Sequence, residues 1–159
     1  MYKYILFFLP LICFGGSVNY KFGTGLSHGG INIVDGKVSL FSLSHEREIS
    51  SLFQRKLETG VWADSSGKGR LGSAYGNYSI GVSVEPVPFY VNTFVGVAGI
   101  SSPDVFLSTF FQFTHDIAIG IEDKKHRRFG LSFKHISNAG IKSPNIGRNF
   151  IQIGVGVPW

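Results

Sequence analysis

The chain has 159 residues, a length that fits one domain. Charged residues make up 16% and aromatic residues 14%, and 21 glycines are spread along the sequence, which favours an all-β protein of short strands. Beyond the first fifteen residues, no stretch has the ~18 uninterrupted apolar residues of a membrane-spanning helix. The formal charge of +5 suits an anionic lipid surface as well as nucleic acid, so charge alone assigns no function.

Residues 1–15 have the pattern of a secretory signal peptide. Lys3 supplies the positive start, residues 5–12 form the apolar core, and residues 13–17 form a small-residue cleavage region. The residue before Cys13 is isoleucine rather than a small residue, which argues against a lipoprotein anchor. An apolar first strand of the fold is the alternative. We therefore expect an exported chain with a single mature domain, residues 16–159, that contains no cysteine.

Eight runs of strand length follow, separated by turn-forming residues. We expect strands at about Val18–Leu26, Lys37–His45, Ser50–Trp62, Gly72–Val84, Phe89–Gly99, Val105–Ile121, Arg127–Ser137 and Asn149–Trp159. The links after the second, fourth and sixth runs are compact, and those after the first, third and seventh are longer and polar. This difference predicts short periplasmic turns and longer outer loops.

Apolar side chains alternate with polar side chains or glycines in the later runs. In the seventh run, Phe129 and Phe133 lie on one face, while Arg128 and Lys134 lie on the other; Phe94 is an exception in the fifth run. A second face of charges and glycines suits the interior of a small membrane barrel, and the run lengths suit a tilted crossing. We predict an all-β, eight-stranded antiparallel transmembrane β-barrel of the outer membrane. A lipocalin-like soluble barrel is the alternative.

Three polar residues are expected at the outer end of the lipid-facing surface. His135 and Ser137 share parity with Phe133, and Asn149 shares parity with Ile151 on the returning strand, close to His135. Polar side chains that face lipid cost free energy, so their presence at such positions indicates a function. A serine becomes a nucleophile when a neutral histidine takes its proton, so these residues indicate ester hydrolysis.

The segment after Ser137 has the composition of an oxyanion site. Gly140, beside another small residue, lets backbone N–H groups approach a substrate, and Asn138 and Asn145 carry amide donors. Among the other histidines, we expect His28, His45 and His126 to be solvated in loops or turns. His115 is expected to face lipid near the inner end of the sixth run, as an interfacial residue. Metal-ligand spacings and phosphate-binding glycine loops are absent from the sequence, so we expect no metal and no cofactor.

The string from His135 to Lys142, followed by Pro144, Asn145 and Gly147, resembles the signature of the lipid A 3-O-deacylases, the PagL family. Those proteins are eight-stranded outer-membrane barrels, and the resemblance is strongest over residues 127–159. It implies that Ser137 is the nucleophile and His135 the general base, and that Asn138, Gly140 and Asn145 lie in the oxyanion segment. The third member of the family's triad is a glutamate, whose position falls on Asn149 here. Asparagine can orient an imidazole but brings no negative charge.

The resemblance implies a serine esterase without a cofactor, acting on the ester-linked 3-hydroxyacyl chain at the 3-position of lipid A in the outer leaflet. Its partners would be lipopolysaccharide and outer-membrane lipids, with no nucleic acid and with a homodimer left open. Weaker substrate-binding candidates are Lys142 and Arg148, which could meet the lipid phosphates, and Phe113 and Phe133. The alternatives are a catalytically weak or inactive barrel with a structural or adhesion role, and an esterase acting on phospholipid.

Overall fold

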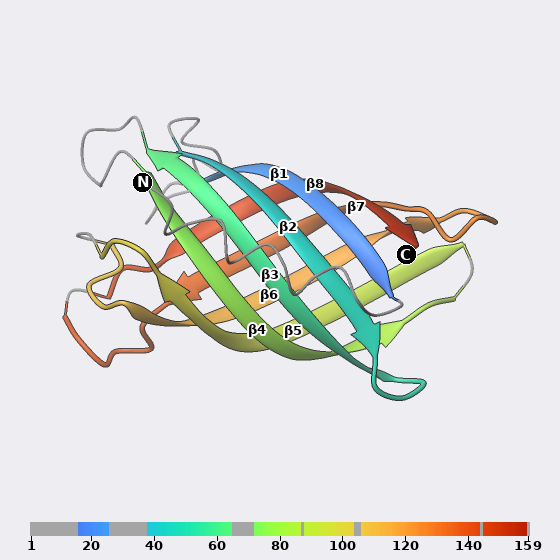
Figure 1. Ribbon diagram of the computed structural model, residues 1–159, viewed down its shortest axis with the longest axis horizontal. Helices are drawn as coiled ribbons and strands as arrows, with labels where there is room; N and C mark the ends of the chain where they lie inside the picture. Colours follow the sequence, from blue (N-terminus) through green and yellow to red (C-terminus); the bar gives the residue numbers. More distant parts are fainter. Residues whose placement is uncertain are drawn as a thin grey trace, which may run out of the picture.

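The chain folds into a closed antiparallel β-barrel (Figure 1). The computed structural model describes residues 16–25, 38–64, 72–86, 88–103, 106–143 and 145–158. In these residues each strand pairs with the next one in sequence, and β1 pairs with β8 to close the barrel. The strands are β1 Ser17–Gly25, β2 Val38–Glu48, β3 Phe53–Asp64, β4 Gly72–Val84, β5 Phe89–Ile100, β6 Phe111–Glu122, β7 Arg128–Ser137 and β8 Arg148–Pro158. The predicted fold class is confirmed; the expected signal peptide, residues 1–15, lies outside the described residues.

The two ends of the barrel differ in their connections. The predicted compact links after the second, fourth and sixth runs and the longer link after the seventh are confirmed, whereas the links after the first and third runs lie outside the described residues. Compact links at residues 49–52, 85–88 and 123–127 define what we call the turn end, on the right in Figure 1. The longer links at residues 101–110 and 138–147 belong to the opposite end, which we call the loop end. This asymmetry is typical of outer-membrane barrels, whose turns are short on the periplasmic side.

The sixth strand begins later than predicted. β6 starts at Phe111 rather than at Val105, and Leu107 forms an isolated bridge with Asn145 of the link between β7 and β8. Leu107 is fully buried. Its hydrophobicity serves packing between two loops, which a strand pattern in the sequence cannot distinguish from packing in a sheet. Because β6 starts at Phe111, the residues that follow Phe111 lie nearer the loop end than the sequence predicted.

The outer surface of the barrel is an apolar belt. Each strand contributes large hydrophobic side chains that are exposed, among them Phe22, Phe41, Val61, Ile80, Val95, Ile119, Leu131 and Ile153. Contiguous exposed apolar surface of this kind suits contact with lipid acyl chains and is unfavourable in water. The described residues include no helix of the length and apolarity needed to cross a bilayer.

The interior near the loop end is apolar. The cluster there comprises Val38, Leu40, Trp62, Tyr75, Ile100, Leu107, Ile136 and Phe150, with Phe106 packed against it. The Trp62 ring lies 5.8 Å from the Tyr75 ring and 6.3 Å from the Phe150 ring, between centroids. This cluster fixes the ends of the strands that carry the residues discussed below. The interior is therefore less uniformly polar than the glycines and charges of the sequence indicated.

The middle of the barrel holds a charged network. Asp116 Oδ2 accepts hydrogen bonds from Lys56 at 2.7 Å and from Lys21 at 3.3 Å, and it forms an ion pair with Lys134 at 3.2 Å. Glu58 lies 2.7 Å from Lys134 and 3.2 Å from Lys56. Buried charges are tolerated only when they are paired and hydrogen-bonded in this way.

Phe94, the exception to the alternation in β5, points into this network and is 2% exposed. Its ring lies under the Lys56 ammonium group, with 4.5 Å between Nζ and the ring centroid. A cation–π contact is favourable when the cation is shielded from water. An aromatic residue at an inward position is thus explained by the lysine above it.

Candidate active site

The candidate site lies on the outer face of β7 and β8 near the loop end. Lys134 and Ile136 are both fully buried inside the barrel, so alternation turns His135 and Ser137 outward. The same alternation turns Asn149 outward between two buried residues, Arg148 and Phe150. The sequence predicted these outward positions.

A hydrogen bond joins the two strands at this site. His135 pairs with Asn149 in the β7–β8 register, and His135 Nδ1 lies 2.6 Å from Asn149 Oδ1. An amide oxygen is only an acceptor, so Nδ1 carries the ring proton and donates it. In this tautomer Nε2 has its lone pair available, and Asn149 fixes the plane of the ring. A histidine held in this way can act as a base through Nε2.

Gly147 packs against both candidate catalytic residues. It has a φ of +75°, and a Cβ at this position would lie 3.0 Å from His135 Cε1 and 3.4 Å from Ser137 Cβ. The imidazole edge and the serine therefore flank one point of the backbone. Among the hydrogen bonds of the described residues, none joins Ser137 Oγ to His135 Nε2, the bond that a nucleophile and base need. Such bonds are often long until substrate is bound.

The link after β7 is organised by Asn138, which is fully buried. Its Nδ2 donates to Ser108 Oγ at 2.9 Å and to the Lys142 carbonyl at 2.7 Å, so both amide protons are used within the protein. Its backbone N–H donates to Asn145 Oδ1 at 3.0 Å, and its own Oδ1 accepts from the Gly140 N–H at 2.9 Å. These bonds make Asn138 and Gly140 structural elements of the loop.

Asn145 is therefore the better donor for a substrate oxyanion. It is exposed, and its Oδ1 is occupied by the Asn138 N–H. The contacts of the described residues give its Nδ2 no protein partner, so this group can donate to a bound carbonyl oxygen. Of the three oxyanion candidates from the sequence, the structure leaves Asn145 with a free side-chain donor.

A second loop supports the site, and the sequence reasoning missed it. In the link between β5 and β6, the Phe106 carbonyl accepts a hydrogen bond from the Gly147 N–H at 3.1 Å. Leu107 pairs with Asn145, and Ser108 binds Asn138. Three consecutive residues thus hold the loop that follows Ser137. Only the apolar character of Phe106 and Leu107 hinted at this packing.

The weaker substrate-binding candidates fall into two groups. Phe113 lies directly opposite Ser137 in the β6–β7 register, and Phe113 and Phe133 are each 38% exposed on the outer face. Lys142 is exposed in the loop. Arg148, in contrast, is 7% exposed and points inward, where its guanidinium lies 2.9 Å from Asp64 Oδ2. The predicted contact of Arg148 with lipid phosphates was wrong, because its side chain is an interior ion-pair partner.

The other histidines differ in position from our expectations. His115 faces outward, but it lies opposite His135 in the β6–β7 register and not near the turn end as predicted. His45 is in β2 and 7% exposed, so its assignment to a solvated loop was wrong. His126 is exposed in the β6–β7 turn, as predicted, with Nδ1 2.7 Å from Glu122 Oε1. His28 lies outside the described residues.

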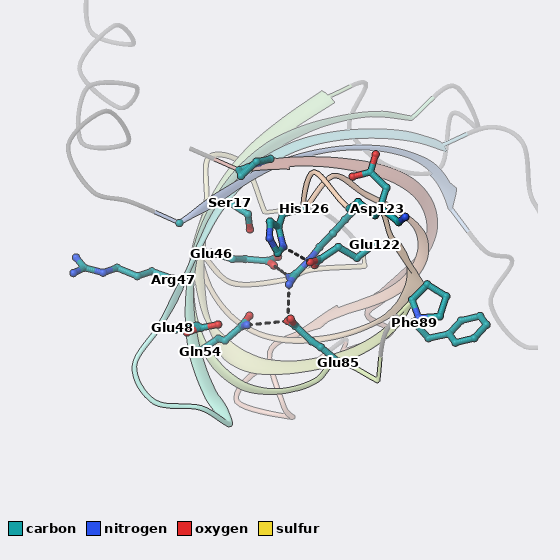
Figure 2. Close-up of a pocket in the computed structure, with 15 residues that line it drawn as sticks. Ser17, Glu46, Arg47, Glu48, Gln54, Glu85, Phe89, Glu122, Asp123 and His126 are labelled. Carbon is teal, nitrogen blue, oxygen red and sulfur yellow. Dashed lines mark hydrogen bonds and ion pairs between the residues drawn. The ribbon is translucent and has the colours of Figure 1, made fainter.

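The turn end has a separate cavity of about 950 Å³ (Figure 2). Carboxylates of Glu46, Glu85 and Glu122 converge there on the Arg128 guanidinium, at 3.9, 2.5 and 2.7 Å. At the centre of this cavity, Arg128 and its three carboxylate partners therefore neutralise one another. Nor do the described residues contain a group of three His, Cys, Asp or Glu side chains that could hold a metal ion. The candidate chemistry is confined to the loop end.

The chain is similar to known proteins in both sequence and structure. Residues 50–158 match the family model described as Lipid A 3-O-deacylase (PagL). A lipid A deacylase PagL from Bordetella bronchiseptica is 37% identical over 68 residues, which are 41% of this chain and 38% of that protein. The alignment therefore spans about two fifths of the length of this relative.

Two solved structures share the fold. The crystal structure of the outer membrane enzyme PagL has a TM-score of 0.65 at 16% identity, covering 90% of this chain and 99% of that chain. The Yersinia pestis outer membrane protein Ail, solved in a phospholipid bilayer nanodisc, has a TM-score of 0.53 at 13% identity, covering 91% and 99%. At these identities the likeness concerns the barrel alone.

Proposed function

The chain belongs to the lipid A 3-O-deacylase (PagL) family, and we propose that it is an outer-membrane serine esterase. It hydrolyses the ester-linked 3-hydroxyacyl chain at the 3-position of lipid A. The observation that carries this proposal is the 2.6 Å hydrogen bond between His135 Nδ1 and Asn149 Oδ1, which directs His135 Nε2 away from Asn149. His135 lies two residues before Ser137, and both side chains are on the lipid-facing surface. The Bordetella relative is a lipid A deacylase, which agrees with this proposal.

In the proposed mechanism, Ser137 Oγ attacks the acyl carbonyl carbon while His135 Nε2 takes the hydroxyl proton. Asn145 Nδ2 donates to the oxyanion of the tetrahedral intermediate. The intermediate collapses when the bond to the sugar oxygen breaks, and His135 returns the proton to that oxygen. Water then attacks the acyl-enzyme while His135 accepts a proton from it. The bond between the acyl carbon and Ser137 Oγ breaks, His135 returns the proton to Oγ, and a free 3-hydroxy fatty acid leaves. No cofactor takes part.

The position of the site supports a lipid substrate in the outer leaflet. The site lies at the loop end, which by its longer links is the outer end of an outer-membrane barrel. The exposed side chains around Ser137 and His135 include the apolar rings of Phe113 and Phe133. An ester at the boundary between headgroups and acyl chains can reach Ser137 from the bilayer without entering the barrel. Lipid A carries such esters.

Asn149 makes a catalytically weak or inactive barrel the main alternative. An asparagine orients the ring but does not stabilise the imidazolium that forms when Ser137 loses its proton. The other alternative is an esterase acting on phospholipid, whose ester lies at a similar depth. Both are outcomes of the same experiment.

The experiment is to express the chain in outer membranes and to follow lipid A by mass spectrometry. The expected result is the loss of one 3-hydroxyacyl mass, abolished in Ser137→Ala and His135→Ala. The matched controls are Ser39→Ala, on the outer face of β2, and His126→Ala, in the exposed turn; both should retain activity. Unchanged lipid A with a correctly folded barrel would refute the proposal. Release of unhydroxylated fatty acid from phospholipid would identify the other ester as the substrate.

A further inference from the structure

A second polar pair lies beside the candidate site on the lipid-facing surface. His115 of β6 is exposed and directly opposite His135, and its Nε2 lies 3.2 Å from Thr93 Oγ1 of β5. Directly opposed residues of antiparallel strands have Cβ atoms about 4.5–5.5 Å apart. Asn149, His135 and His115 therefore form a polar row across three strands, in a surface that is otherwise mainly apolar.

The outward residues of β6 lead from the nucleophile towards the turn end. Phe113 lies opposite Ser137, His115 is the next outward residue, and Ile117 follows, opposite Thr93. An acyl chain whose carbonyl is at Ser137 must run in this direction, because the hydrocarbon of the leaflet lies below the headgroups. The first polar side chain that it meets past Phe113 is His115.

The Thr93 contact leaves His115 with one ring nitrogen to offer. Nε2 is paired with the threonine hydroxyl, and the contacts of the described residues give Nδ1 no protein partner. A polar side chain turned towards lipid is unfavourable without a hydrogen-bond partner. A hydroxyl or similar group of a lipid in the bilayer would supply that partner for Nδ1. The structure does not need this pair for packing, since both residues lie on the outer face.

We infer that His115, oriented by Thr93, is a binding subsite for the 3-hydroxyl group of the scissile acyl chain. This inference rests on the proposed function. The 3-hydroxyl oxygen is three bonds from the carbonyl carbon that Ser137 attacks. Ser137 and His115 are diagonal neighbours, about 7–8 Å apart, so a carbonyl at the serine and a hydroxyl at the histidine fit between them. The subsite selects hydroxylated acyl chains over the plain chains of phospholipids.

The test compares two esters of the same sugar that differ only in the hydroxyl group, 3-hydroxytetradecanoyl and tetradecanoyl. The purified full-length protein is assayed in detergent micelles, and kcat/KM is measured for each ester. The wild type is expected to prefer the hydroxylated ester by about tenfold, the size of one neutral hydrogen bond at a partly exposed site. His115→Phe should reduce the preference to about twofold or less by slowing only the hydroxylated ester.

Thr93→Val should reduce the preference by a smaller factor, and His115→Gln, which keeps a donor and an acceptor, should retain part of it. Tyr78→Phe is the matched control, because it removes a hydroxyl group from the outer face of β4, away from the site, and should leave the preference unchanged. Equal hydrolysis of the two esters by the wild type, or a preference that survives His115→Phe, would overturn the subsite alone. Failure of the folded wild type to hydrolyse either ester would overturn the proposed function and the subsite with it.

Discussion

Asn149 is the proposed partner of His135, at a position where the family resemblance implies a glutamate, and replacing it with glutamate tests the proposed chemistry directly. Asn149 Oδ1 already accepts the His135 Nδ1 proton at 2.6 Å, so the tautomer needed for catalysis is in place. What the asparagine lacks is charge. Asn149→Glu adds a carboxylate that stabilises the imidazolium formed as Ser137 loses its proton, and we expect kcat to rise.

The size of this gain follows from the geometry. A carboxylate in place of the amide would put the two charges about 4 Å apart, which is worth about 4 kcal/mol at an effective dielectric constant of 20. His135 and Asn149 are only half-buried, and the carboxylate must also be desolvated against the lipid-facing surface. A net stabilisation of about 1.4 kcal/mol remains, which corresponds to about tenfold in kcat.

The assay is single-turnover release of 3-hydroxy fatty acid from lipid A in micelles. Asn149→Gln is the matched control, because glutamine has the length of glutamate without its charge; it should not exceed the wild type. Asn149→Leu should lower kcat by at least tenfold, because the ring loses its orienting partner. Equal rates for wild type, Asn149→Glu and Asn149→Leu would refute the assigned role.

Three further outcomes follow from other parts of the molecule. Asn145→Ala should lower kcat about 10²-fold with little change in KM, because it removes one oxyanion donor, and a change confined to KM would contradict that role. Lys134→Met should destabilise the barrel by about 3 kcal/mol in denaturant titrations, because Asp116 stays buried with one fewer cation; an unchanged midpoint would contradict the network. Hydrogen bonds from the side chain and backbone of Arg127 lower the pKa of Asp123 to about 2. The Asp123 carboxylate should contribute its full stabilisation above pH ~3.9, the pKa of aspartate in the unfolded chain. This contribution should disappear as the pH falls through about 2, the pKa of Asp123 in the folded protein. Arg127→Ala should raise the Asp123 titration midpoint measured by NMR, and an unmoved midpoint would exclude this cause.

The faces of the strands were predictable because alternation is a local property. A strand that turns Phe129, Leu131 and Phe133 to lipid must also turn His135 and Ser137 outward, whatever its neighbours are. The same rule would have placed Arg148 inside, since it shares parity with Phe150. The ion pair of Arg148 with Asp64 shows that strand parity is a better guide to the position of this side chain than its charge.

The depth of residues along a strand was less predictable, because it depends on where the strand starts. The apolar pair Phe106–Leu107 extended the sixth run in the sequence, although these residues pack between loops. That error moved His115 away from His135, its true neighbour across the sheet. Contacts between loops, such as Ser108 with Asn138, join residues thirty positions apart and leave no periodic pattern in the sequence.

The interior of the barrel and its outer site depend on each other. Each outward polar residue of the site lies between two inward anchors: Lys134 and Ile136 flank His135, and Arg148 and Phe150 flank Asn149. The lysine is held by Glu58 and Asp116, the arginine by Asp64, and the two apolar residues by the cluster at the loop end. Because a slip of one residue would exchange the two faces, these anchors fix both the register and the direction of the site. The buried charges therefore do more than fill the interior, which apolar residues alone could also do. They specify which side chains of β7 and β8 face the lipid.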